Sequence, residues 1–424
     1  MSTIIEPEQA NQELEPDPAS RLKVWLWGIG GVLVVIGVVG LVDRFINAHS
    51  NANYGSLVPW GLWISLYIYL IGLSAGAFLI SSLVYGFNVK RFESIGRVSI
   101  FTALVTLGAA LLAVWLDIGH MWRFANVYIY PNFGSPMAWM IWLYTTYFVL
   151  LLFECWFLLR RDFVTGGRGQ DKKAKLYRIL ALGSKEDSDA SETRDRAKVR
   201  VLAIIGIPIA IMFHGGVGTL FGVVLARPAW NTGLFPLMFL LSALVSGGAL
   251  LLFVSAIFQG GWRRHSDTIV ALGRLVLGLL LLDVLFQFSE FLITNYNQAH
   301  GWESMAMILF GPYWYVFWGW QIILGTIVPI FILVWKKTSI DAKWVAAAGL
   351  LIASGFFAVR LNIVIPALSV GEVDGIVEAV NSERVTTDYV PSITEWLVTA
   401  GIFGLLMIGF GIGEKLLPRE AERV

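Results

Sequence analysis

The sequence predicts an all-α integral membrane protein, and its composition and hydropathy pattern carry that prediction. Of its 424 residues, 57% are apolar and only 14% are charged, whereas a soluble domain has about 25% charged residues. The mean hydropathy is +0.69. Ten apolar stretches are each long enough to cross about 30 Å of hydrocarbon as a helix. We therefore expect ten transmembrane helices.

The ten stretches account for most of the chain. They run approximately over residues 24–42, 59–85, 98–116, 137–159, 201–224, 234–258, 268–293, 313–335, 344–366 and 393–413. The ninth is the weakest, because Arg360 and Asn362 interrupt its apolar run. Residues 1–23 are acidic and contain proline but have neither a basic segment nor a small-residue cleavage site, so we expect a cytoplasmic tail there rather than a signal peptide.

The distribution of basic residues predicts the orientation of the chain. If the N terminus is cytoplasmic, the inner connections hold 26 of the 31 Lys and Arg residues and the outer connections hold five. Such a bias toward the cytoplasmic side is the positive-inside rule. Both termini are therefore predicted to be cytoplasmic. The five outer residues are Arg44, Arg123, Arg227, Arg360 and Arg384.

An internal repeat predicts two similar halves. The segment LSAGAFL (73–79) returns as VSGGALL (245–251), and GSPMAWMIW (134–142) returns as FGPYWYVFW (310–318), at separations of 172 and 176 residues. Four helices per half give the halves the same orientation, as in parallel repeats. We expect one four-helix bundle over 59–225, with a cytoplasmic loop at 160–200, and a second over 226–366. The segments 24–58 and 367–424 supply the flanking helices.

The segment between the third and fourth helices, 116–142, carries ionisable residues beside the membrane. Asp117 and His120 are three residues apart, so on a helix they share a face. Trp122 and Arg123 follow, and then the aromatic residues Tyr128 and Tyr130. Ionisable groups at membrane depth are costly and suggest a functional site. The alternative is that these side chains simply lie in the headgroup zone.

The fifth helix contributes two further candidates. His214 lies in the run FHGGVGTLFG, where it can donate a hydrogen bond to a ligand carbonyl or take a proton. Its alternative role is a hydrogen bond between helices. Arg227, in ARPAW, is predicted at the outer end of the same helix. Its alternative role is a side chain that extends to the membrane surface.

A possible proton path is indicated by four polar residues within predicted helices. Asp283, Gln287 and Glu290 are spaced by four and three residues, which places them on one face of the seventh helix. Glu154 lies in the cytoplasmic half of the fourth helix. An isolated charge at this depth must pair, become neutral or line a wet path. The alternative is a structural polar cluster between helices.

Other kinds of site are disfavoured by the residue inventory. Cys155 is the only cysteine, so the chain can ligate no iron–sulfur cluster and form no internal disulfide. Five histidines offer no clear pair of haem ligands at matched depth, and no Cys/His spacing is typical of a metal site. The net charge of +1 gives no indication of nucleic-acid binding. Any redox metal must therefore belong to a partner.

Four motifs together resemble the NrfD-like family, the membrane subunits of polysulfide-reductase type. They are Pro59–Trp60 with SAGAFL, LDIGH…WRF…GSPMAW, HGGVG with ARPAW, and FGPYWYVFWGWQ, and they span about residues 55–365. The resemblance implies two four-helix bundles and a quinone or quinol pocket in the first bundle near the outer face. It also implies an extracytoplasmic iron–sulfur partner and, in the same complex, a molybdopterin enzyme or a multihaem cytochrome. Some members have eight helices, whereas ten are expected here.

The resulting hypothesis is a quinone-reactive subunit in the bacterial cytoplasmic membrane, using menaquinone or ubiquinone, with proton translocation as a further expectation. His120 or His214 would hold a quinone oxygen, and Asp117 would accept a proton. An aromatic slot, a charge beside Asp117 and a second outer arginine would complete the pocket: Trp122, Tyr128, Tyr130, Arg123 and Arg227. A secondary transporter, which also suits parallel repeats, and a purely structural membrane anchor are the alternatives.

Overall fold

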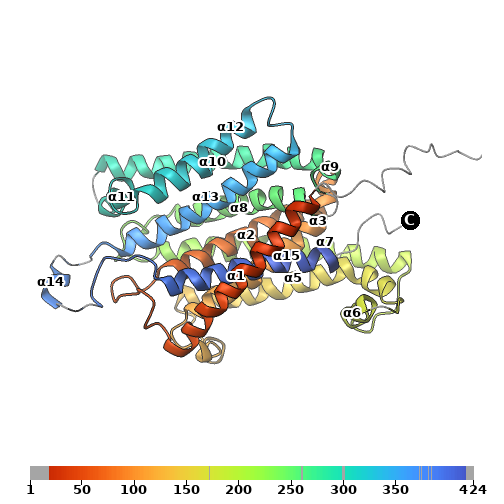
Figure 1. Ribbon diagram of the computed structural model, residues 1–424, viewed down its shortest axis with the longest axis horizontal. Coiled ribbons are helices and arrows are strands. Elements are labelled where there is room, and N and C mark those ends of the chain that lie inside the picture. The colour runs from red at the N-terminus through yellow and green to blue at the C-terminus, as the bar shows by residue number, and fades with distance from the viewer. Residues whose placement is uncertain are drawn as a thin grey trace, which may run out of the picture.

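The computed structural model describes residues 19–416, except 171, 259–260, 298–300, 372, 374, 381 and 383. The predicted N-terminal tail before residue 19 lies outside this range. The described chain is helical, without a strand, and ten of its helices are long and apolar enough to cross a membrane. This confirms the predicted fold class. The long helices run side by side along the length of the molecule (Figure 1).

The spanning helices are α1 (Ser20–Asn47), α2 (Leu62–Tyr85), α3 (Glu93–Asp117), α5 (Pro136–Gly166), α7 (Asp189–Gly222), α8 (Phe235–Ile257), α10 (Ser266–Asn297), η4 continued by α12 (Val316–Ile327 and Val328–Val334), α13 (Ala342–Leu368) and α15 (Ile393–Leu416). The short helices are η2 (Lys90–Phe92), η3 (Met121–Arg123), α4 (Asn126–Ile129), α6 (Lys172–Leu180), α9 (Gly261–Arg264), α11 (Trp302–Leu309) and α14 (Ile376–Val380).

Local sequence explains where several helices begin. The Ser135 hydroxyl accepts the backbone N–H of Met137, and Pro136 occupies the first turn of α5. The Asp341 carboxylate accepts the N–H of Lys343 at the start of α13. Serine and aspartate satisfy the otherwise unpaired first N–H groups of a helix, and proline is favoured at the first helical position.

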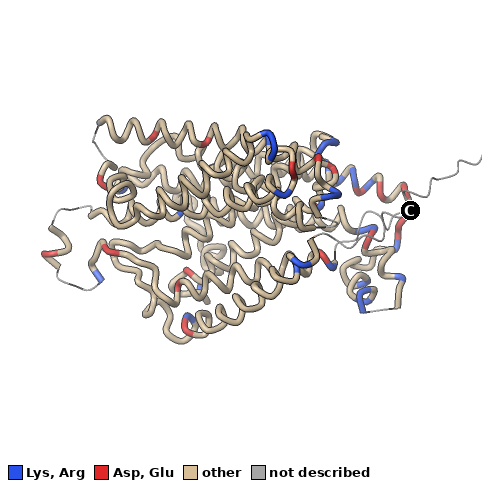
Figure 2. The backbone as a smooth tube through the Cα atoms, turned by 45° about the horizontal axis from the view of Figure 1, so that its top comes forward, with Lys and Arg blue, Asp and Glu red and all other residues tan. Residues whose placement is uncertain are grey.

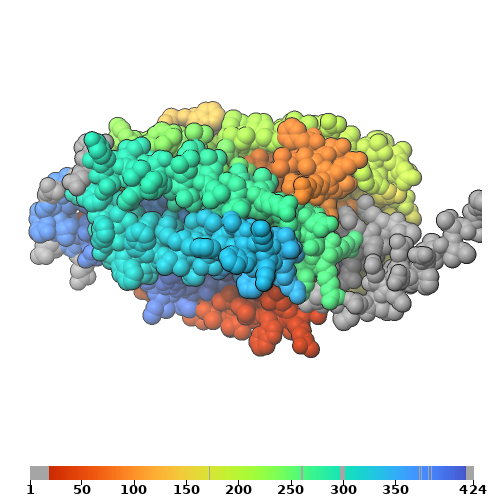
Figure 3. All heavy atoms as spheres, turned by 90° about the horizontal axis from the view of Figure 1, so that it is seen from above, coloured from red at the N-terminus to blue at the C-terminus, as the bar shows by residue number. Residues whose placement is uncertain are grey.

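The helices pack in two groups and one pair. Helices α2, α3, α5 and α7 contact one another, as do α8, α10, η4–α12 and α13, and α2 lies against α8 between the groups. Helices α1 and α15 pack along each other, and α15 packs against α3. Seen from above, α10 and α12 cover one face of the molecule (Figure 3).

Glycines permit the two closest helix crossings. A Cβ atom on Gly76 would lie 1.9 Å from the carbonyl oxygen of Ala243, so only glycine allows α2 to approach α8 there. A Cβ atom on Gly37 would lie 2.1 Å from the Cα atom of Gly401, which fixes α1 against α15. Small residues serve this purpose in membrane helices generally.

Both ends of the described chain lie at the same end of the molecule as α6 (Figure 1). Lys23 pairs with Glu414, and the Tyr177 hydroxyl donates to the carbonyl oxygen of Leu416 at 2.7 Å. Most of the Lys and Arg residues gather at this end (Figure 2). Ten crossings return the chain to the side on which it began. That this side is cytoplasmic stays a prediction of the positive-inside rule.

Candidate functional site

Asp117 lies at the last position of α3, at the end of the molecule opposite α6. The Tyr54 hydroxyl donates to its carboxylate at 3.0 Å. The buried guanidinium of Arg44, from α1, donates to the carbonyl oxygens of Leu116 at 2.8 Å and Ile118 at 2.9 Å. A cation is favourable at a helix C terminus, where carbonyl groups lack helical partners. Arg44 therefore ends α3 and also brings a positive charge beside Asp117.

A second carboxylate, Glu395, is buried near Asp117 at the start of α15. It accepts the Tyr389 hydroxyl and, at 3.0 Å, the backbone N–H of Asn53. Tyr389 in turn accepts the N–H of Leu62 at 2.9 Å, which joins α15 to the start of α2. Every contact pairs a buried polar group, as membrane depth requires. Glu395 thus anchors the connection that carries Tyr54.

His49 completes this group, and one of its nitrogens has no partner. Its ring lies 5.5 Å from the ring of Tyr54 and 5.8 Å from that of Trp63. Its Nε2 atom is buried and makes no hydrogen bond to the described residues. Burial, and then the charge of Arg44, lower the pKa of His49 to about 4. The imidazole is therefore neutral at pH 7 and can donate or accept one hydrogen bond at Nε2.

We call Arg44, His49, Tyr54, Asp117, Tyr389 and Glu395 the outer cluster. Burial, and then the charge of Asp117, raise the pKa of the Tyr54 hydroxyl, so it stays a proton donor at neutral pH. Asp117, His49 and Tyr54 are each partly exposed, whereas Glu395 and Arg44 are buried. The accessible side of the cluster therefore presents a carboxylate, a hydroxyl and an unpartnered imidazole nitrogen.

His120 does not share a helix face with Asp117, contrary to the expectation from spacing. The helix ends at Asp117, and Ile118 adopts an extended conformation with ψ 123°. The three-residue periodicity therefore stops before His120, which is exposed at the start of η3. Sequence spacing alone carried the helix one turn too far.

The other predicted pocket residues of this loop form an exposed surface. Trp122 packs against Phe45 and Trp115, with ring centroids 6.2 and 6.1 Å apart, and is 76% exposed. The Tyr128 hydroxyl lies 2.8 Å from the hydroxyl of Thr145. Arg123 and Tyr130 are exposed. This surface adjoins the outer cluster through α1 and α3.

His214 lies away from the outer cluster, between the two helix groups. A Cβ atom on Gly72 would lie 3.5 Å from Cε1 of His214 and 3.7 Å from Nη2 of Arg360. The glycine of α2 thus leaves space in which the imidazole of α7 and the guanidinium of α13 approach each other. Both ring nitrogens of His214 are buried without a partner among the described residues.

Arg227 is buried in the connection between α7 and α8, where it binds backbone carbonyls. Its Nη1 atom donates to Val370 at 2.7 Å and to Ala367 at 3.3 Å, and Nη2 donates to Leu57 at 3.3 Å. These contacts join the end of α13 to the connection that precedes α2. They explain its position without a ligand.

Asp283 and Gln287 belong to a directed row of hydrogen bonds in the second helix group. Asn362 Nδ2 donates to Gln321 Oε1 at 2.8 Å, and Gln321 Nε2 donates to Gln287 Oε1 at 2.8 Å. Gln287 Nε2 then donates to Asp283. Because every donor faces the same way, the row directs its dipoles toward the Asp283 carboxylate. We call these four residues the amide row.

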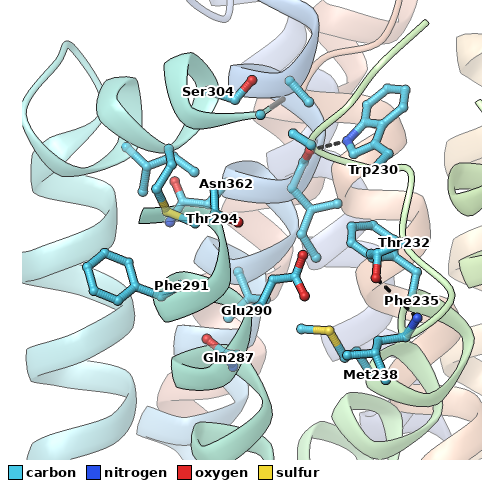
Figure 4. Close-up of a pocket in the computed structure, with 18 of the residues that line it drawn as sticks. Trp230, Thr232, Phe235, Met238, Gln287, Glu290, Phe291, Thr294, Ser304 and Asn362 are labelled. Atoms are coloured by element: carbon cyan, nitrogen blue, oxygen red, sulfur yellow. Dashed lines mark hydrogen bonds between the residues drawn. The ribbon is translucent and has the colours of Figure 1, made fainter. Parts of the chain in front are cut away.

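The amide row lines a cavity of about 650 Å³. The Glu290 carboxylate points into this cavity, and Trp230, Thr232 and Met238 face it from the opposite side (Figure 4). Glu154, in contrast, is buried in α5 of the first group, and both of its carboxylate oxygens lack a partner among the described residues. The four proposed proton-path residues therefore divide between the two groups.

The helix that carries Gln321 is a π-helix of twelve residues, η4. The Thr326 hydroxyl donates to the carbonyl oxygen of Gln321, five residues earlier, at 3.0 Å. Long π-helices are rare, and π turns occur frequently at functional sites. No local feature of the sequence indicated it.

Sequence reasoning missed His49, Tyr54, Arg44 and Glu395. Their separation from Asp117 along the chain, up to 278 residues for Glu395, hides the cluster from any local pattern. The available signal was the presence of ionisable residues at the outer ends of both flanking helices. Within the described residues, no group of three His, Cys, Asp or Glu side chains could hold a metal ion.

Comparison with known proteins gives matches along most of the chain. Residues 49–371 match the family described as "Polysulphide reductase, NrfD". The C subunit of selenate reductase from Mesobacillus selenatarsenatis is 39% identical over 398 residues, which cover 91% of this chain and 93% of that protein. The Hdr-like menaquinol oxidoreductase integral membrane subunit of Archaeoglobus fulgidus is 28% identical over 401 residues, 92% and 93% of the two chains. The putative membrane protein C of a dimethyl sulfoxide reductase from Halobacterium salinarum is 26% identical over 410 residues, 93% and 91%.

The contacts of Arg227 predict a structural role that mutation can test. Arg227→Met leaves buried carbonyl oxygens without their donor, which costs about 1–3 kcal/mol of stability. We expect a lower thermal unfolding midpoint of the purified protein in detergent. Arg384→Met, at an exposed outer arginine, is the matched control and should leave the midpoint unchanged. Equal midpoints for both variants would contradict the structural role.

Proposed function

The chain belongs to the NrfD polysulphide reductase family, and from this membership we propose that it exchanges electrons with quinone or quinol at the outer cluster. It is a multi-pass integral membrane subunit of a respiratory oxidoreductase complex. Menaquinone is the proposed quinone, because one relative is named a menaquinol oxidoreductase subunit.

One observation carries the proposal, namely the unpartnered Nε2 atom of His49 beside the Tyr54–Asp117 pair. A buried polar atom without a partner is costly, and such atoms call for an explanation. A quinone oxygen would supply the missing hydrogen bond. The neutral state of His49 suits this role, since a neutral imidazole can bind the oxygen of either redox form with the appropriate tautomer.

The neighbouring groups suit the proton chemistry. Oxidation of a quinol to a quinone releases two protons and two electrons. Asp117 would accept one proton, and the Tyr54 hydroxyl, which donates to Asp117 at 3.0 Å, would orient the carboxylate and pass protons toward the exposed side. The charge of Arg44 at the end of α3 offsets the negative charge that Asp117 carries. The reverse reaction uses the same groups as proton donors.

The electrons require a partner, because a chain with one cysteine cannot hold an iron–sulfur cluster. We propose an extracytoplasmic iron–sulfur protein, in a complex with a molybdopterin enzyme or a multihaem cytochrome, at the bacterial cytoplasmic membrane. The exposed loop around Trp122, Arg123 and Tyr130 adjoins the outer cluster and is the proposed contact surface. Docking there would keep the electron-transfer distance short.

Proton translocation is a second part of the proposal, and the second helix group is its proposed location. Asp283 is buried at membrane depth beside Arg360, and the amide row ends on it. A carboxamide has no proton that titrates, so the row can orient Asp283 but cannot conduct protons by itself. Protons would therefore travel between Asp283 and Glu290 through the cavity.

Two variants of the outer cluster test the proposed quinone site. His49→Ala removes the hydrogen bond to the quinone oxygen, and Asp117→Asn removes the proton acceptor. We expect each to lower quinol-dependent turnover of the assembled complex by about 100-fold, which is a usual loss for a positioned acid or base. The measurement is steady-state turnover with a soluble quinol analogue.

The control for these variants is Tyr296→Ala, at a residue that is 89% exposed and should retain normal turnover. Co-purification of the other subunits checks assembly in each case. Normal turnover of both His49→Ala and Asp117→Asn in assembled complexes would remove the proposed site and leave the family assignment intact.

Asp283→Asn tests proton translocation separately. The variant keeps the hydrogen bond from Gln287 within reach but removes the titratable group. We expect electron transfer to continue while proton uptake or release per electron, measured in proteoliposomes with a pH-sensitive dye, falls by about tenfold, within the usual contribution of a positioned acid or base. Unchanged proton movement with unchanged electron transfer would rule out a path through Asp283.

A further inference from the structure

We propose that the cavity of the second helix group is a second binding site for a quinone or quinol, with a flat aromatic head and an apolar tail. The ligand class rests on the proposed function of the outer cluster. The site itself rests on the cavity, its lining and its relation to the outer cluster.

The cavity has the size and composition of a small-molecule site. Its volume is about 650 Å³, within the range of about 300–1,000 Å³ typical of ligand pockets. It lies between α8, α10, α11, η4 and α13, beside the connection that precedes α8 (Figure 4). Its apolar lining includes five aromatic side chains, which suit a flat ring: Trp230, Phe235, Phe239, Phe291 and Phe317.

The polar part of the lining can bind both redox forms. Each carboxamide nitrogen carries two N–H groups, and the bonds of the amide row use one at Gln287, one at Gln321 and one at Asn362. All three residues line the cavity, so their second N–H groups can donate to quinone oxygens. The Glu290 carboxylate, which points into the cavity, can accept a quinol hydroxyl.

The internal repeat relates this cavity to the outer cluster. Glu290 follows Asp117 by 173 residues, between the repeat separations of 172 and 176. Each carboxylate lies near the outer end of the second helix of its half. Asp117 meets Tyr54 from the connection that precedes α2, and Glu290 faces the connection that precedes α8. The two positions are therefore equivalent in the repeat.

The two connections also contact each other. Trp60, just before α2, stacks on Trp230, just before α8, with ring centroids 6.0 Å apart and an interplanar angle of 23°. Trp230 lines the cavity, and its Nε1 atom donates to the carbonyl oxygen of Ile363 at 2.7 Å, which fixes its ring. A ligand in the cavity would thus lie one aromatic layer away from the first half of the molecule.

The test uses the purified native complex and a photoreactive azido-naphthoquinone with a short isoprenoid tail. We expect two probe molecules per chain, with labelled peptides both around residues 49–63 and around 230–239 or 287–294. Met238→Trp fills the cavity from α8 and should lower the stoichiometry to one, with loss of the second set of labels only. Leu237→Trp, on the adjacent outward position that is 55% exposed, is the matched control and should retain two.

The remaining outcomes separate this inference from the proposed function. One bound probe, labelled only near residues 49–63 and unaffected by Met238→Trp, would overturn the second site and leave the outer cluster intact. A label confined to the cavity would support the second site and contradict the outer cluster. Recovery of only phospholipid from the cavity, with no probe label there, would also overturn the inference. Thermal unfolding of each variant confirms that it is folded.

Discussion

The cost of placing polar groups at membrane depth governs this structure. With no water to bind, each such group must find a partner within the protein. Asp117 meets Tyr54 beside the charge of Arg44, and Asp283 receives the amide row. The exceptions are informative, because the unpartnered nitrogen of His49 lies where a ligand oxygen is proposed to bind.

The flanking helices are part of the outer cluster rather than additions to it. The glycine contact of Gly37 with Gly401 holds α1 against α15, and those helices carry Arg44 and Glu395 to the end of α3. The first group of four helices alone therefore cannot form the cluster. In the second half the cavity is closed instead by α11 and by the connection that precedes α8.

Hydropathy and residue spacing were sufficient to predict the ten helices, and the motifs were sufficient for the family, because both signals are local. The face shared by Asp283, Gln287 and Glu290 was also predictable, since all three lie within one helix. The outer cluster was not predictable, because His49 meets Asp117 only through tertiary packing. His120 was placed on the face of Asp117 because spacing does not reveal that α3 ends before Ile118.

The most direct test of the quinone site is an electron cryo-microscopy map of the native complex with a bound quinone analogue. We expect density for the aromatic head next to the outer cluster, with one oxygen within about 3 Å of Nε2 of His49, the length of an ordinary hydrogen bond, and the ring beside Tyr54 and Asp117. Head-group density that leaves His49 and Asp117 without contact, at a concentration that saturates turnover, would contradict the assignment.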